Sequence, residues 1–142
     1  AISVCEEVDV PFTNIIKAVL LAKAKGTKKL EDALENSSLD EIPKLEKYLP
    51  ILATIASVST LLGFTGTVLG MINAFNSIAQ AGTSSPSIVA SGIAQALVTT
   101  AAGLLIAIPT IIFHHYFSNK IDKITRTIEL KGKELIEFLV GR

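Results

Sequence analysis

Four uncharged polar side chains hold the most informative positions in this chain of 142 residues. They lie within residues 48–119, a stretch that contains no Asp, Glu, Lys or Arg: Thr67, Thr99, Thr100 and Gln95. A hydroxyl group both donates and accepts hydrogen bonds, and a primary amide in an apolar medium is costly unless it meets a polar partner or a cavity. None of the four groups relays a proton by ionising, so a proton channel built from this stretch must borrow its carboxylate.

Other chemistry finds little support in the sequence. The titratable side chains of the uncharged stretch are two histidines, His114 and His115, and two phenols, Tyr48 and Tyr116. The place of the histidines near its end favours interfacial anchoring or a cation at a helix C-terminus, and leaves a role in proton exit open. Adjacent helical residues point about 100° apart, so the pair predicts no metal site. The single Cys5 allows no intrachain disulfide. We expect no cofactor, no nucleic-acid partner at zero net charge, and no enzyme.

The uncharged stretch is long enough for two membrane-spanning helices. Residues 49–75 extend about 40 Å and residues 88–117 about 45 Å as helices, against a hydrocarbon core of about 30 Å. The segment 76–87 between them is polar, with Ser85 as the predicted N-cap and Pro86 as the first helical residue. The sequence therefore predicts an all-α membrane protein with a long transmembrane helical hairpin.

The cations predict how the hairpin is oriented. Seven lysines precede it and six Lys or Arg residues follow it, whereas the turn 76–87 has none. The positive-inside rule then places both ends of the chain in the cytoplasm and the turn outside, on the opposite side of the membrane. The predicted organisation is a cytoplasmic helical segment over 1–47, the transmembrane hairpin over 48–117 and a cytoplasmic C-terminal helix over 118–142.

Amphipathic helices are expected to extend beyond the lipid. Residues 12–25 are predicted to be helical up to Gly26, residues 27–38 to form a second short helix, and a third helix to lead through Pro43 and Pro50 into the membrane. After the hairpin, apolar residues recur at helical spacing: Ile121, Ile124, Ile128, Leu135 and Leu139. We expect these stripes to pack against neighbouring helices or subunits.

Each predicted span has one face of small residues and one bulky face. Helices gain little in lipid from burying leucine, and associate where small residues let their backbones approach. The glycines expected to serve such packing are Gly63, Gly66, Gly70, Gly92 and Gly103. Two interpretations stay open for the threonines: each bonds its own backbone within a tight helix pair, or part of the small face lines a central space. Gln95 favours the second, and Pro109 predicts a kink in the second span.

Two segments then resemble a known family. "LPILATIASVSTLLGFTGTVLGMINAFNSIAQ" and "VASGIAQALVTTAAGLLIAIP", with the motifs G-T-V-x-G and A-L-x-x-T-A-x-G-L, are similar to the MotA/TolQ/ExbB proton-channel family, above all to ExbB and TolQ. The resemblance implies an inner-membrane motor in which a pentamer surrounds two transmembrane helices of ExbD or TolR. An aspartate of that partner takes up and releases protons, and the flow drives TonB or TolA.

The resemblance also assigns residues. The pore-facing threonines of the family fall on Thr67 and Thr100, with Thr99 and Gln95 as further neutral hydrogen-bond partners for the carboxylate of the partner helix. Many relatives carry a glutamate where this chain has Gln95, so proton relay by ionisation is not assigned to this subunit. Pro109 matches the A-I-P of the family.

One departure concerns the start of the chain. The family normally has a further transmembrane helix upstream, and nothing in residues 1–47 is apolar enough to form it, so we expect that helix to be missing. Two other interpretations stay open: a non-conducting membrane scaffold, and a flagellar-type stator ring, which the short loops disfavour.

Overall fold

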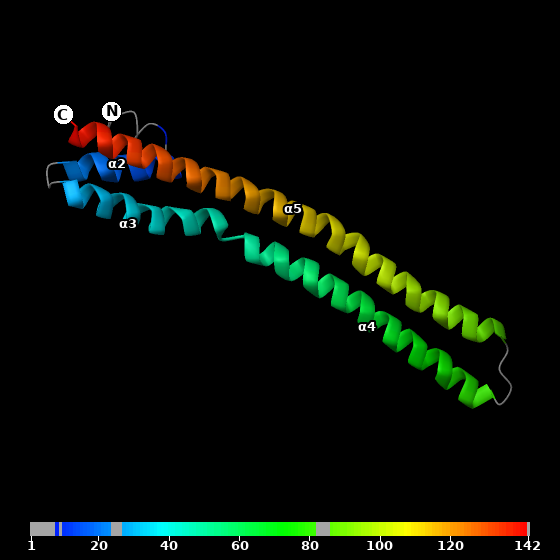
Figure 1. The fold of residues 1–142 in the computed structure, drawn as a ribbon. Coiled ribbons are helices and arrows are strands. Elements are labelled where there is room, and N and C mark those ends of the chain that lie inside the picture. Colours follow the sequence, from blue (N-terminus) through cyan, green and yellow to red (C-terminus); the bar gives the residue numbers. More distant parts are fainter. Residues whose placement is uncertain (1–7, 9, 24–26, 82–85, 142) are drawn as a thin grey trace. The chain divides into compact units, whose positions relative to one another are not determined.

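The computed structural model describes residue 8 and residues 10–23, 27–81 and 86–141, and within these ranges it is helical with no β-strand. The helices are α2 (Pro11–Ala22), α3 (Thr27–Glu46), α4 (Leu49–Ala81) and α5 (Pro86–Val140) (Figure 1). The predicted caps Gly26 and Ser85 lie outside the described residues, whereas Pro86 is the first residue of α5, as predicted. The all-α fold with two long apolar helices is therefore confirmed.

The chain divides into two compact units. Residues 49–116 form the hairpin unit, made of α4 and the first part of α5. Residues 1–48 together with 117–142 form the helical unit, made of α2, α3 and the last part of α5.

In the hairpin unit, α4 continues to Ala81, past the predicted end of the first span at Phe75. The polar residues of this extension are compatible with a helix, and neither glycine nor proline interrupts it before Gly82. At its other end α4 begins at Leu49, with Pro50 in the first turn, where the missing N–H of proline has no intrahelical acceptor to lose. Both helices of the unit carry windows long and apolar enough to cross a bilayer.

In the helical unit, three helices enclose a core of aliphatic side chains. The buried residues are Ile15 and Val19 of α2, Leu30 and Leu34 of α3, and Ile128 and Ile136 of α5. Leu135 and Leu139 pack against this core, as the predicted apolar stripe of the C-terminal segment requires. The buried face differs from the predicted stripe at two positions. Ile136 is buried although the prediction did not include it, and Ile124 is 38% exposed although the prediction did. The position of α2 and α3 around α5, not spacing alone, decides which turn is covered.

The prediction of two helices across residues 27–50 is wrong, because α3 is one helix with Pro43 inside it. Proline removes the backbone donor that would serve the carbonyl of Leu39. Leu39 is 65% exposed, so water can satisfy that carbonyl and the helix continues to Glu46. The chain turns at Lys47 and Tyr48, immediately before α4 begins.

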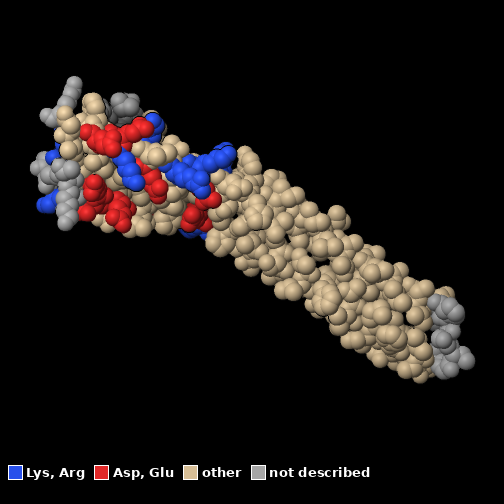
Figure 2. Space-filling view, viewed as in Figure 1, with Lys and Arg blue, Asp and Glu red and all other residues tan. Residues whose placement is uncertain are grey.

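Charged side chains cover the helical unit and are absent from the sequence of the hairpin unit, as the face in Figure 2 shows. Two ion pairs on the helical unit join residues one turn apart, Lys44 to Glu41 at 2.6 Å and Lys131 to Glu134 at 2.7 Å. The Glu41 side chain is 14% exposed, whereas both side chains of the second pair are exposed. An exposed pair such as the second contributes about 0.5 kcal/mol. The two pairs indicate a water-facing surface more than a source of stability.

Candidate functional site

The two helices of the hairpin unit meet through their smallest residues. The buried residues among those described in this unit are Ala56, Gly63, Ala74, Ala96, Gly103 and Ala107. A Cβ atom added at Gly103 would lie 2.6 Å from the carbonyl oxygen of Ser59 and 2.9 Å from Cα of Gly63. Because both obstacles are backbone atoms, only glycine at position 103 permits this approach.

The remaining glycines of the hairpin extend the same contact along the helices. A Cβ atom at Gly70 would lie 2.5 Å from Cβ of Ala96, and one at Gly92 would lie 2.9 Å from Cβ of Ala74. A Cβ atom at Gly66 would overlap the side chain of Thr99. Each glycine thus stands opposite a small residue or a threonine of the other helix.

Thr67 and Thr100 form the polar centre of this contact. Their hydroxyl oxygens lie 3.0 Å apart, and the Thr100 hydroxyl also lies 2.9 Å from the carbonyl oxygen of Gly63, to which it can donate. The Thr67 hydroxyl has alternative acceptors in its own helix, the carbonyl oxygens of Phe64 at 2.8 Å and Gly63 at 3.3 Å. Each hydroxyl has one proton, so the pair can exchange donor and acceptor roles without moving a backbone atom.

The other threonines of the two helices behave differently. Thr60 donates to the carbonyl of Ala56 at 3.0 Å, and Thr110 to that of Ile106 at 2.7 Å. Such bonds to the preceding turn are the usual way in which a threonine satisfies its hydroxyl within a helix. Within the described part of the hairpin unit, the threonine hydroxyls that bond across to the other helix are those of the central pair.

Gln95 and Thr99 lie outside this pair. Both residues are exposed on the hairpin unit, and the Thr99 hydroxyl donates to the carbonyl of Ala96 in its own helix at 2.7 Å. The Gln95 side chain is available to whatever surrounds the hairpin, whether lipid or another helix, whereas the Thr99 side chain also lies against Gly66 of α4. Their predicted role beside a partner helix stays a prediction.

The histidines and the proline of α5 form no site with the threonine pair. The His114 and His115 rings meet edge to face with their centroids 5.4 Å apart. Among the described residues, no group of three His, Cys, Asp or Glu side chains is arranged to hold a metal ion. Pro109 lies inside α5, which continues through it as one helix to Val140.

The residue-to-residue register of the hairpin was missed by sequence reasoning, although a signal for it exists. In every facing pair, the two residues are about equally far along the sequence from residue 83. The pairs are Gly63–Gly103, Thr67–Thr100, Gly70–Ala96 and Gly92–Ala74. In an antiparallel hairpin with a tight turn, residues equally distant from the turn must face each other. Folding the small-residue pattern about the midpoint of 82–85, between the ends of α4 and α5, pairs Thr67 with Thr100, whereas the midpoint of the predicted turn 76–87 would pair Thr67 with Ala96.

Taken together, the fold and this contact define an all-α membrane protein whose two spans associate through glycine, alanine and threonine. The sequence matches the MotA/TolQ/ExbB proton channel family over residues 7–130, and the chain belongs to that family.

Its relatives carry ExbB and TolQ names. It is 33% identical over 96% of its length to a putative biopolymer transport protein ExbB-like 3 of Synechocystis, and 40% identical over 70% of its length to the Tol-Pal system protein TolQ of Haemophilus influenzae. It is 43% identical over 54% of its length to the biopolymer transport protein ExbB of Salmonella typhimurium. The alignments cover 62%, 42% and 32% of these relatives, so the chain corresponds to only part of each.

Proposed function

We propose that this chain is a proton-channel subunit of an inner-membrane motor of the ExbB/TolQ type. In this proposal a homo-pentamer surrounds an ExbD- or TolR-like single-span partner that carries a membrane aspartate. Proton flow through the complex is coupled to TonB- or TolA-dependent processes at the outer membrane, and both ends of the chain face the cytoplasm. The observation that carries the proposal is the Thr67–Thr100 hydroxyl pair at the centre of a hairpin without formal charges.

The chemistry of the pair suits a proton carrier supplied by another protein. A nearby lysine or arginine would lower the pKa of a partner carboxyl and hold it ionised. A threonine hydroxyl can accept a bond from a protonated carboxyl and donate one to a carboxylate. The pair can change roles within its own hydrogen-bond set, since Thr67 has acceptors in α4 and Thr100 has one across the interface. The threonine pair therefore strongly favours neither the protonated nor the ionised form of the partner carboxyl.

The exposed amide of Gln95 also supports an occupied space beside the hairpin. An unpartnered amide in hydrocarbon is expensive, so a neighbouring subunit or partner helix is the better surrounding for it. Thr99, one turn further along α5, is exposed as well. We propose that these two residues face the partner helix together with the edge of the threonine pair.

The experiment is a proton-flux assay in liposomes that contain the protein with and without its single-span partner. Thr67→Val and Thr100→Val each remove a hydroxyl of the pair while keeping the shape of the side chain. Loss of one hydrogen bond to a charged group costs about 1.5–3 kcal/mol, which corresponds to a reduction in flux of about tenfold to hundredfold.

Thr60→Val and Thr110→Val are the matched controls, because their hydroxyls bond only their own helix. Full flux in a Thr67→Val/Thr100→Val double variant of normal assembly would remove the threonines from the pathway. Absence of flux from the unaltered protein with its partner would instead favour the non-conducting scaffold.

A further inference from the structure

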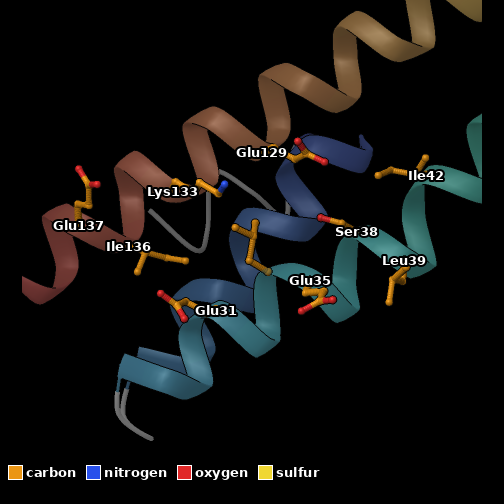
Figure 3. Close-up of a pocket in the computed structure, with 10 residues that line it drawn as sticks. Glu31, Glu35, Ser38, Leu39, Ile42, Glu129, Lys133, Ile136 and Glu137 are labelled. Atoms are coloured by element: carbon orange, nitrogen blue, oxygen red, sulfur yellow. The ribbon is translucent and has the colours of Figure 1, made fainter.

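We infer that the helical unit has a docking groove for a basic amphipathic helical segment of a partner protein. The groove lies between α3 and the last part of α5 and has a volume of about 700 Å³ (Figure 3). This inference concerns a surface that the proposed proton pathway does not use, and it stands or falls independently of proton conduction.

The rim of the groove is strongly acidic. Glu31 and Glu35 come from α3, and Glu129 and Glu137 come from α5, so carboxylates stand on both sides. Among the described residues that line the groove, one is a cation, Lys133. Among the described residues, no ion pair engages any of the four carboxylates, and all four residues are exposed. An excess of unpaired negative charge in a chain of zero net charge attracts a positively charged ligand.

The floor of the groove is apolar. Leu34 and Ile136 are only 8% and 6% exposed and close the groove from below, where they belong to the core of the unit. Ile42 is half-buried, and Leu39 at one end is 65% exposed. A bare cation would therefore satisfy the rim but leave the floor uncovered. A segment with apolar side chains on one face and Lys or Arg beside them satisfies both.

The spacing along the helices sets the length of the occupant. The lining residues of α3 recur from Glu31 to Ile42 at steps of three and four, which places them on one face of that helix. Eleven helical steps extend about 16 Å. This is the length of about three helical turns, so a segment of about twelve residues fits. The groove thus has the form of a helix-binding site, with anchors at i, i+4 and i+7.

A second copy of this chain fits the groove poorly, although the helical unit also has a basic patch. That patch, which includes Lys120, Lys123 and Ile124, is centred about nine residues before Lys133 on α5. Nine residues of helix correspond to about 13 Å. In a closed ring with its axis along α5, equivalent residues lie at equal heights, so the basic patch of one copy would miss the acidic groove of the next. The charge complementarity therefore favours a different protein.

Binding of synthetic peptides to the purified full chain in detergent tests this inference. The probe is a fluorescein-labelled peptide of about twelve residues with leucine at i, i+4 and i+7 and lysine beside each leucine. Two comparison peptides replace every lysine by glutamate or every leucine by serine. We expect fluorescence anisotropy to show saturable binding of the first peptide, weakened by added salt, and no binding of the other two.

Two double variants decide whether the groove is the site. Glu35→Lys/Glu129→Lys changes one rim residue on each helix, whereas Asp40→Lys/Asp122→Lys makes the same change in charge at exposed positions of the same helices outside the groove. The first should raise the Kd by about tenfold or more, and the second by less than about twofold.

An equal loss of peptide affinity in both double variants would show that binding depends only on the overall charge of the protein, and would overturn the inference. So would binding of the serine peptide as tightly as the leucine peptide. If Glu35→Lys/Glu129→Lys disrupts the native assembly while the unaltered protein binds no peptide, the groove is a contact between copies and the inference is wrong.

Discussion

The hairpin unit and the helical unit bury opposite kinds of residue. In the hairpin unit the buried positions are alanines and glycines, while Leu105 is 75% exposed and Leu62 is 65% exposed. In the helical unit the largest fully buried side chains are aliphatic, among them Ile15 and Ile128, and the charged side chains lie outside. A single helix, α5, contributes to both patterns without interruption from Pro86 to Val140.

This difference indicates that the two units fold against different solvents. In water, burial of apolar surface drives helices together, so the largest aliphatic side chains form the core. In lipid that driving force is missing, and close contact between small residues with hydrogen bonds across the interface takes its place. The membership of the chain in a proton channel family agrees with a hairpin that lies in lipid. Three pairs of substitutions test the contrast, from the largest expected effect to the smallest.

Truncation of the helical core should give the largest effect. Ile128→Ala removes a side chain that is 1% exposed and contacts a closed aliphatic cluster, which costs about 2–5 kcal/mol. Ile124→Ala, one turn earlier at 38% exposure, should cost far less. Denaturant unfolding followed by circular dichroism measures the difference. Equal midpoints for the two variants would contradict a water-driven core in this unit.

A lysine introduced on the outer surface of each unit tests most directly whether that surface faces lipid or water. Leu105→Lys places a cation on the bulky face of the hairpin, at a cost of about 3 kcal/mol in lipid. Leu130→Lys changes a residue of the same type in the same helix, 63% exposed but in the helical unit, and should cost almost nothing. The measurement is the amount of protein that resists alkaline extraction from membranes. Normal yield of Leu105→Lys would show that this face is not in lipid.

Added methyl groups compare the packing of the two units. Gly103→Ala directs its Cβ at backbone atoms of α4, which cannot rotate away, and should cost about 1–3 kcal/mol. Gly132→Ala in the helical unit meets the tip of the Leu34 side chain at 2.5 Å, which can turn aside. The gain in helix propensity, about 1 kcal/mol, offsets that adjustment. Thermal unfolding in detergent should therefore rank Gly103→Ala below Gly132→Ala, and the reverse order would contradict a backbone contact in the hairpin.

Sequence patterns were sufficient for the type of element and for the small and bulky faces of the hairpin. They were insufficient where the outcome depends on what covers a helix. The sequence predicted one helix over 27–38 and another through Pro43, yet α3 continues as one helix because an exposed helix can lose one hydrogen bond to water. Likewise, periodicity included Ile124 and omitted Ile136, because spacing identifies a stripe but not the turns at which α2 and α3 cover it.

What the amino-acid sequence determined by itself is the medium of each segment: an uncharged block of membrane length and charged amphipathic flanks impose two solvents on one chain. What only the tertiary structure decided is which groups meet, namely that Thr100 rather than Thr99 bonds Thr67, and that four glutamates from two helices line one groove. The physical reason is that hydropathy is a property of each residue and accumulates along the chain. A hydrogen bond or a groove instead depends on the register between two helices, which their packing sets.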